Sequence, residues 1–339
     1  MFNLNFLKGH RTTFSHQYIA DLYWVLSQPS LLPNSAVLNH PSMKEPIEND
    51  IQWLDNFMAL ENQQAPRKHL IAHWQEILAA LNQNPTPLIN FIEQRDAKRV
   101  GFYFEALISF AIQHAYSLSL IKEHIQLNHN KNTLGEIDFL IRDNTSGECI
   151  HLETAIKFYL KSDPWFTPEN PYQQWLGPMV KDRLDLKLNK LIHRQVQITQ
   201  HPNYPSCENA TLLPKVDKRA VLMTGYLFDN QFERTQNYWL TQKEILNHLE
   251  DNHSRYQIAI KPFWLCFPNP TTQTPDMHWL TKHQLIAEIN NIIQQWNRPV
   301  LVFQNENLDL APNQASQIPD SIKRFFIVPD NWKGLSPPN

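Results

Sequence analysis

Hydrophobic and polar residues alternate strictly between Gly135 and Phe158, and this period of two predicts a β-hairpin. A polar segment that ends in glycine, residues 144–147, separates the two β-rich runs and predicts the turn. If the hairpin closes symmetrically about that turn, Asp138 lies directly opposite Glu153. Opposed residues of neighbouring strands have Cβ atoms about 4.5–5.5 Å apart, so the pattern predicts two adjacent carboxylates.

Each strand of this hairpin is expected to bury one face only. The apolar face is predicted to carry Ile137, Phe139, Ile141, Ile150, Leu152, Ile156 and Phe158. The charged face is predicted to carry Glu136, Asp138, Arg142, His151, Glu153 and Lys157. Like charges that face each other repel, and proteins keep them together with a shared proton or a cation. A divalent metal ion is the commoner solution for hard oxygen ligands.

Helical spacing of apolar residues predicts helices over 14–32, 51–60 and 66–81. Prolines follow the first and third of these runs, which indicates where those helices end. We therefore expect residues 1–95 to form a mostly helical N-terminal portion.

A further helix is predicted over residues 99–116, where apolar side chains cover nearly the whole circumference, Phe102 among them. A helix that is apolar all round is usually buried. Glu105 lies inside this run, and an unpaired buried carboxylate is costly or takes up a proton. Glu105 is therefore expected to have a cationic partner, either a metal ion or an arginine.

A proline- and aromatic-rich loop follows the hairpin, and residues 182–195 then read as a helix with one apolar face. The other face is expected to align four cations, Arg183, Lys187, Lys190 and Arg194. The loop aromatics are candidates for stacking on bases or for ordinary packing: Trp165, Phe166, Tyr172 and Trp175. Residues 219–228 read as a buried strand.

The last third alternates strand-like runs at 258–267, 299–303 and 325–328 with two helices. Those helices are predicted to begin alike, with capping boxes that follow Trp239 and Trp279. No motif in this third indicates a particular chemistry.

Composition narrows the possible functions. The 30 basic and 33 acidic residues nearly balance, so any contact with nucleic acid has to come from a local patch. The 7 glycines include no dinucleotide or P-loop fingerprint, and the serine elbow of hydrolases is missing. The 3 cysteines are far apart, which is typical of a reducing compartment. With no secretory signal or long apolar run, the sequence predicts a cytoplasmic protein without a membrane partner.

The order of these features over residues 96–228 resembles the PD-(D/E)XK nuclease superfamily. Phe104-Glu105 is similar to the helix glutamate of that superfamily, and Gly135-Glu136-Ile137-Asp138 is similar to its G-x-[IL]-D motif. Glu153-Thr154-Ala155-Ile156-Lys157 occupies the place of its (D/E)-x-K strand. The chain also resembles a bacterial family catalogued only as a domain of unknown function, through YFEAL, LGEIDFLIRD, HLETAIKFYL and WLGP followed by DRLDLKL.

The resemblance implies an α/β fold: a restriction-endonuclease-like core, a mixed sheet in α-β-β-β-α-β order, with the helical portion before it and an α/β extension over 229–339. It implies that Asp138, Glu153 and Glu105 hold Mg²⁺ or Mn²⁺ and that the protein hydrolyses DNA or RNA. The superfamily lysine would stand at Ala155. Lys157 lies two residues further on, four after the acid, which is about 13 Å along a strand.

Three functions therefore stay open. The first is a metal-dependent nuclease in which Lys157 orients the attacking water and the four-cation helix holds phosphates. The second is a catalytically inactive nuclease-like fold that binds nucleic acid or a protein. The third is a structural adaptor, in which Lys157 only pairs with Glu136, the cations form a solvated face, and Glu105 is a hydrogen-bonded structural acid.

Overall fold

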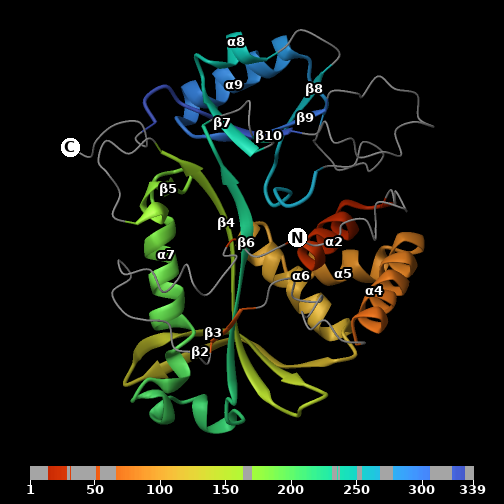
Figure 1. The fold of residues 1–339 in the computed structure, drawn as a ribbon, viewed down its shortest axis with the longest axis vertical. Coiled ribbons are helices and arrows are strands. Elements are labelled where there is room, and N and C mark those ends of the chain that lie inside the picture. Colours follow the sequence, from red (N-terminus) through yellow and green to blue (C-terminus); the bar gives the residue numbers. More distant parts are fainter. Residues whose placement is uncertain are drawn as a thin grey trace.

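The protein is described here by a computed structural model, which covers residues 14–28, 31, 51–53, 66–162, 170–230, 235, 237–249, 254–267, 278–305 and 323–332. The fold is mixed α/β, with two sheets and a group of helices toward the N-terminus (Figure 1). No helix within these ranges is long and apolar enough to cross a membrane.

The first sheet contains six strands, in the order β1-β6-β4-β3-β2 with β5 paired to β4. Its strands are β1 (Ile51–Trp53), β2 (Leu118–His129), β3 (Asn132–Asp143), β4 (Cys149–Lys161), β5 (Trp175–Leu176) and β6 (Lys218–Phe228). The pairs β4–β6 and β1–β6 are parallel, whereas β2–β3, β3–β4 and β4–β5 are antiparallel. Along the chain, α6, β2, β3, β4, α7 and β6 follow the predicted order of helix, three strands, helix and strand.

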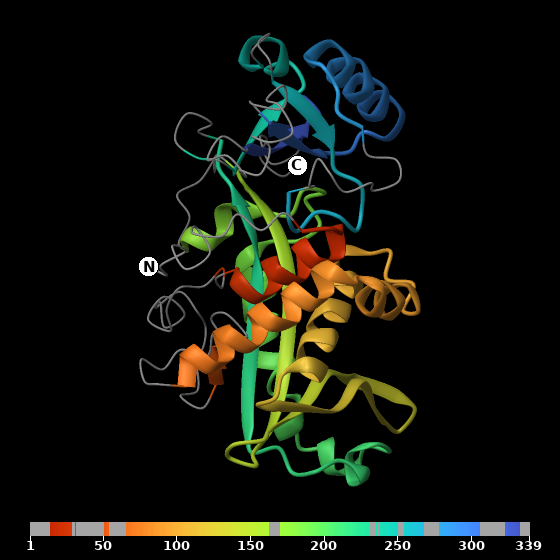
Figure 2. The ribbon, with the colours of Figure 1, turned by 90° about the vertical axis from the view of Figure 1, so that its right-hand side faces the viewer.

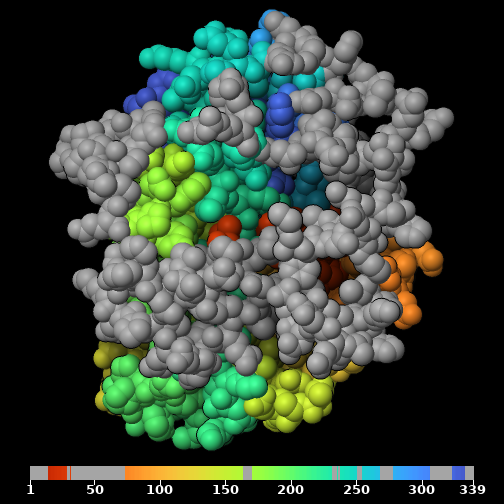
Figure 3. Space-filling view, in the orientation of Figure 1, coloured from red at the N-terminus to blue at the C-terminus, as the bar shows by residue number. Residues whose placement is uncertain are grey.

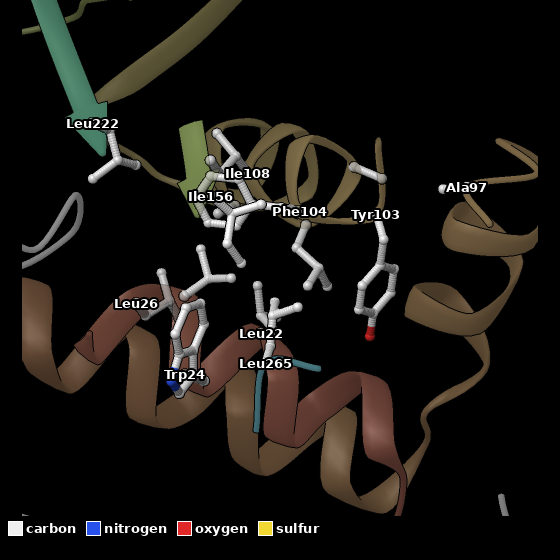
Figure 4. Close-up of a cluster of buried hydrophobic side chains, with 14 of the residues drawn as sticks. Leu22, Trp24, Leu26, Ala97, Tyr103, Phe104, Ile108, Ile156, Leu222 and Leu265 are labelled. Carbon is white, nitrogen blue, oxygen red and sulfur yellow. The ribbon is translucent and has the colours of Figure 1, made fainter. Parts of the chain in front are cut away.

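Helices cover both faces of this sheet (Figures 1 and 2). One face carries α7 (Leu184–Lys190), which a π-helical turn (Leu191–Gln195) continues. The other face carries α2 (Gln17–Ser27), α4 (Pro66–Gln83), α5 (Thr86–Glu93) and α6 (Val100–His114). Figure 4 shows how this side packs: Leu22 and Trp24 of α2 and Phe104 of α6 meet Ile156 of β4 and Leu222 of β6 in one buried cluster.

One prediction for the N-terminal portion was wrong. Residues 51–53 form a strand that pairs with β6 rather than the start of a helix, because the edge of the sheet offers them backbone partners. The helix α4 ends at Gln83, before the prolines, as predicted, but a further helix, α5, follows at once with Pro87 in its first turn. Proline is well tolerated there, because the first backbone N–H groups of a helix have no partner inside the helix.

The apolar side chains of α6 that were predicted to be buried are buried, with one exception. Phe102 is 54% exposed, whereas its neighbours Tyr103 and Phe104 are fully buried. The exposure of Phe102 could not be predicted from its apolar character, because it depends on which other segments lie beside the first turns of α6.

The second sheet contains four strands in the order β7-β10-β9-β8, and it lies at the end of β4 and β6 (Figure 1). Its elements are β7 (Asn237–Thr241), α8 (Ile245–His248), β8 (Arg255–Ile258), α9 (Lys282–Trp296), β9 (Val300–Asn305) and β10 (Lys323–Val328). One face packs on α9, and the other joins the core cluster of the first sheet through Trp239, Phe303 and Phe326. Figure 3 shows a continuous surface from residues near 175 of the first sheet (lime) to residues near 240 of the second sheet (cyan).

This part corrects two further expectations. Residues 237–241 form a strand, where a helix was expected to begin after Trp239. The strand predicted over 258–267 instead covers Arg255–Ile258. The helix α9 begins with the predicted capping box of Thr281 and Gln284. The corresponding segment after Trp239 forms only the four-residue helix α8. Glu244, directly before this helix, accepts from the Thr241 amide at 2.7 Å.

A buried carboxylate connects the N-terminal helices to the second sheet. Asp21 is fully buried; its Oδ2 accepts from the Tyr103 hydroxyl at 2.8 Å, and its Oδ1 accepts from the Cys266 amide at 2.9 Å. Burial raises the pKa of Asp21 to about 7, although these hydrogen bonds and the charge of Arg324 act in the opposite direction. The folded protein therefore holds a proton at Asp21 that the unfolded chain releases near pH 4.

Asp21→Asn is expected to flatten the pH dependence of stability. A raised folded-state pKa gives stability that is fully present below the unfolded pKa and is lost as the pH rises through about 7. Between pH 5.5 and pH 8.5 the wild type should therefore lose about 2 kcal/mol through this group, and the variant should not. Urea denaturation at several pH values measures the difference, with the exposed Asp96→Asn as control. Parallel pH profiles for wild type and Asp21→Asn would contradict the assignment.

Candidate functional site

The strands β3 and β4 separate at the two predicted carboxylates. They pair from Arg142–Cys149 to Phe139–Leu152, and the next pair in this register is Asp138–Glu153. Beyond it, β3 continues only along β2, and β4 continues along β6. The predicted register is confirmed, and the two acids lie where the hairpin divides; we call this point the acid fork.

Each carboxylate at the acid fork binds the backbone of the opposite strand. The Thr154 amide donates to Asp138 Oδ2 at 2.8 Å, and the Thr154 hydroxyl lies 3.3 Å from the same oxygen. The Asp138 amide in turn donates to Glu153 Oε1 at 3.4 Å. These side-chain bonds replace the ladder of the sheet at the point where the strands part, and they hold both carboxylates in place.

Glu153 is completely buried and has a second set of polar partners. His151 Nε2 lies 2.8 Å from its Oε1, and the Gln195 amide donates to its Oε2 at 3.0 Å. Burial lowers the pKa of His151 to about 4, so this imidazole is neutral at physiological pH. Glu153 is thus held by neutral donors, which orient it without supplying a full counter-charge.

The pKa values indicate that three acids share this region. Burial raises the pKa of Glu153 to about 8, and burial followed by the charge of Glu153 raises that of Asp138 to about 7. Burial followed by the charge of Asp138 raises the pKa of Glu105, on α6, to about 7. The charges of these acids thus act on one another, and the region holds protons near neutral pH that isolated carboxyl groups would release.

Lys187 is the cation that the structure directs toward the acid fork. Its Nζ donates to Gln195 Oε1 at 3.0 Å, and Gln195 in turn binds Glu153. Burial and the nearby Lys157 lower the pKa of Lys187, whereas the charges of Asp138 and Glu153 act in the opposite direction. The π turn contains an additional residue per turn, which brings Gln195 into line with Lys187.

Lys157 does not lie where the sequence analysis placed it. The alternative in which it forms an ion pair with Glu136 is wrong, because β3 has left β4 at that level and Glu136 Oε1 lies 3.2 Å from His124 Nδ1 instead. Its Nζ instead contacts Asp182 Oδ2 at 2.5 Å. Lys157 is thus bound in a partly exposed ion pair.

The other three predicted cations differ from Lys187. Arg183 forms an ion pair with Asp185 at 2.6 Å, while Lys190 and Arg194 are exposed. The expected alignment of four cations is thus interrupted by the π turn and by this ion pair. Their role in binding nucleic acid stays a prediction.

The aromatic loop is only partly described. Trp165 and Phe166 lie outside the described residues, whereas Tyr172 and Trp175 pack against the cluster beneath α7. For these two side chains the packing interpretation therefore holds.

Three further side chains at the site were not predicted to act there: His151, Gln195 and His124. His151 has a signal in the sequence, since it lies two residues before Glu153 on the same side of the strand. His124 has a positive φ of 51°, which is unusual for a residue within a strand. Its Nδ1 lies 3.2 Å from Glu136 Oε1, and its charge acts on Glu105. No sequence pattern indicates this backbone conformation.

The face pattern of the hairpin also needs correction. Both faces of β4 are buried, because α7 covers the side that carries His151 and Glu153. On β3, Ile137 packs with Leu140 rather than with Phe139.

The donor set of the acid fork suits a hard divalent cation in kind, since carboxylate and backbone oxygens are what such ions prefer. Among the described residues, no three Asp, Glu, His or Cys side chains form a ready metal-binding group. Mg²⁺ is commonly held by one or two carboxylates, with water and substrate phosphate supplying the other oxygens. Asp138 and Glu153 fit that requirement, and Glu105 as a third ligand stays a prediction.

Comparison with known proteins gives one match. A family model described as "Domain of unknown function (DUF1853)" matches residues 20–328, which is most of the chain. No curated protein and no solved structure matches the chain.

Proposed function

The chain belongs to the DUF1853 family, whose description assigns no activity, and we propose from the acid fork that it is a metal-dependent phosphodiesterase acting on nucleic acid. The observation that carries this proposal is the convergence of Asp138, Glu153 and Glu105, with raised pKa values, at a point where two strands separate. Burial without a nearby balancing charge raises the pKa of a carboxyl group, and a bound divalent cation would supply that charge.

The fold supports the proposal to a limited extent. The order α6-β2-β3-β4-α7-β6 and the parallel pairing of β4 with β6 are those expected of a restriction-endonuclease-like core. Lys187 of α7 is linked to the acid fork through Gln195, and the charge of Asp138 acts on Glu105 of α6. We therefore propose the nuclease-like core as the ancestry of the fold.

The residues of the acid fork have different roles in the proposed phosphodiester hydrolysis. Asp138 and Glu153 hold the cation, and Thr154, His151 and Gln195 fix the directions of their carboxylates. Bound Mg²⁺ or Mn²⁺ supplies Lewis acidity toward the phosphate and acidifies a water molecule. In the PD-(D/E)XK superfamily a lysine of the (D/E)-x-K strand supplies an amine beside the metal. Here Lys187 supplies that amine, because its Nζ is linked to Glu153 through Gln195. Lys190 and Arg194, exposed on the same helical segment, hold flanking phosphates.

Metal-dependent cleavage is the expected result when the purified chain is titrated with Mg²⁺ or Mn²⁺ in the presence of labelled single- and double-stranded DNA and RNA. Lys187→Gln should reduce the rate by about 100-fold, because a positioned proton-transfer or water-orienting group typically contributes 10²–10⁴. Lys157→Gln, which only breaks the ion pair with Asp182, should change the rate by less than about threefold.

The two lysine variants also separate this function from its alternative. A chain that binds nucleic acid in a salt-dependent manner but cleaves none of the substrates with either metal is an inactive nuclease-like binding module. Equal losses in Lys157→Gln and Lys187→Gln would show that the water-orienting role does not belong to Lys187. EDTA-resistant cleavage would contradict the use of a metal.

A further inference from the structure

An imidazole on β2 lies beside the acid fork. The two chain neighbours of His124 pair with the two chain neighbours of Asp138, so the register places His124 level with that acid on the adjacent strand. Two contacts fix the ring there: its Nδ1 lies 3.2 Å from Glu136 Oε1, and its centre lies 6.1 Å from the centre of the Phe139 ring. Glu136 and Phe139 stand two residues before and one residue after Asp138. His124 therefore borders the aspartate of the fork.

The backbone at His124 is unusual for a strand. Its φ of 51° is a conformation that residues other than glycine adopt at a cost, and such residues are found preferentially at functional sites. The side chain is 46% exposed, and within the part of the chain that the structure describes its Nε2 atom makes no hydrogen bond. One ring nitrogen is thus held by Glu136, and the other is open to a ligand.

This arrangement suits proton transfer. A carboxylate beside Nδ1 accepts the proton of that nitrogen and so fixes the orientation of the ring. The second nitrogen, Nε2, then serves as the atom that gives a proton to a reacting oxygen, and imidazole is the side chain most often used in this way. Because the pair of His124 and Glu136 is partly exposed, solvent can replace the proton after each reaction.

His124 and Lys187 approach the acid fork from opposite faces of the sheet. Glu153 and the helix α7, which carries Lys187, lie on one face. Phe139, which contacts His124, belongs to the core on the other face, which α6 covers. In an in-line displacement the attacking water and the leaving oxygen lie on opposite sides of phosphorus. With Lys187 on the side of the water, His124 is on the side of the leaving group.

We propose that His124, held by Glu136, is the general acid that protonates the leaving oxygen of the scissile phosphodiester. The oxygen of the attacking water bonds to phosphorus, and the water gives up its proton to solvent. The bond from phosphorus to the sugar oxygen breaks, and that oxygen keeps the electron pair and takes the proton of Nε2. The products are a phosphomonoester and an alcohol, and the imidazole regains its proton from solvent. This inference rests on the proposed function and deepens it, because it assigns the release of the leaving group.

The test uses substrates that differ in their need for an acid. Labelled DNA and RNA strands leave a sugar alkoxide, which needs a proton, whereas bis(4-nitrophenyl) phosphate leaves a weakly basic phenolate, which does not. Asparagine adopts a positive φ more readily than most residues, so His124→Asn preserves the backbone. With the full chain and Mn²⁺, His124→Asn should cleave the strands about 100-fold or more slowly than the wild type and the nitrophenyl ester within about threefold of it.

Bridging sulfur repeats the comparison within one polymer. A strand with sulfur in place of one bridging oxygen, on the 3′ or the 5′ side of the scissile phosphorus, leaves a thiolate, which also needs no proton. His124→Asn should cleave one of these two strands at nearly the wild-type rate, and the position of the sulfur identifies the oxygen that leaves. The matched control is His129→Asn, which changes a histidine of the same strand β2 and should leave every rate unchanged.

The inference is overturned if His124→Asn loses activity equally on all substrates, or if neither sulfur position restores cleavage. The thermal midpoint gives a readout independent of catalysis: Mn²⁺ should raise it equally in the wild type and in His124→Asn. Loss of that rise would make His124 a metal ligand and not an acid. A wild type that cleaves none of the substrates removes the phosphodiesterase and this inference together, whereas cleavage that does not depend on His124 removes this inference alone.

Discussion

Glu153→Gln is expected to abolish phosphodiester cleavage and, at the same time, to make the protein more stable at pH 8. Loss of a metal-holding carboxylate removes several kcal/mol of transition-state stabilisation, which corresponds to a rate loss of about 10³-fold or more. The folded-state pKa of Glu153 is raised, so its contribution to stability is present below about pH 4.5 and is lost as the pH rises through about 8. Glutamine keeps the shape and cannot ionise, although its amide nitrogen donates where one oxygen of Glu153 accepts.

The thermal midpoint of Glu153→Gln should therefore exceed that of the wild type by a few degrees at pH 8, and the difference should shrink toward pH 5. Mn²⁺ should raise the midpoint of the wild type more than that of the variant. Asp138→Asn should behave in the same way, because the pKa of Asp138 is raised to about 7. Differential scanning fluorimetry and a cleavage assay measure both effects.

Glu148→Gln is the control for these variants, since Glu148 lies in the exposed turn of the same hairpin and pairs with Lys218. It should change neither activity nor metal response. Cleavage that survives both Asp138→Asn and Glu153→Gln would place the activity elsewhere or in a contaminant. Lower stability of both variants at pH 8 would contradict the rise that burial causes in the pKa values of Glu153 and Asp138.

Gly225→Ala is expected to destabilise the protein by at least about 4 kcal/mol, the range of the most damaging single substitutions. Gly225 of β6 pairs with Lys157 of β4, and its φ is +139°, a conformation that only glycine adopts readily. A Cβ atom there would lie 1.7 Å from the Lys157 carbonyl oxygen. Because this obstacle is backbone in a central strand, it cannot be avoided by a change of rotamer.

Urea denaturation followed by circular dichroism measures this loss, or shows that the variant does not fold. Gly101→Ala is the matched control: it lies in a helix with open space beside it, so alanine should stabilise the protein by up to about 1 kcal/mol. A Gly225→Ala variant within about 1 kcal/mol of the wild type would contradict the close approach of β6 to β4.

The hairpin and its register could be predicted because both depend on local patterns. The period of two sets the faces, the turn sets the pairing, and together they placed Asp138 against Glu153. The division of the strands beyond that pair could not be predicted, since no local pattern shows where β3 leaves β4. The strand β6, which lies some 65 residues further along the chain, pairs with the other edge of β4 on both sides of that point.

The side chains that complete the site depend on tertiary contacts. Lys157 pairs with Asp182, and Lys187 reaches the acids only because a π turn aligns Gln195 with it. Neither contact has a signature at a fixed spacing. Phe102 was predicted to be buried because apolar periodicity describes a helix and not its neighbours.

The sharing of one core between the two sheets limits how this protein can change. Trp239 donates to the Lys161 carbonyl at 2.8 Å, Lys161 pairs with Asp229 at 3.0 Å, and Phe326 packs against Phe228. These contacts fix the far ends of β4, which carries Glu153, and of its neighbour β6. Loss of the last third would therefore expose apolar side chains of the shared core, and we expect the two sheets to unfold together as one cooperative unit.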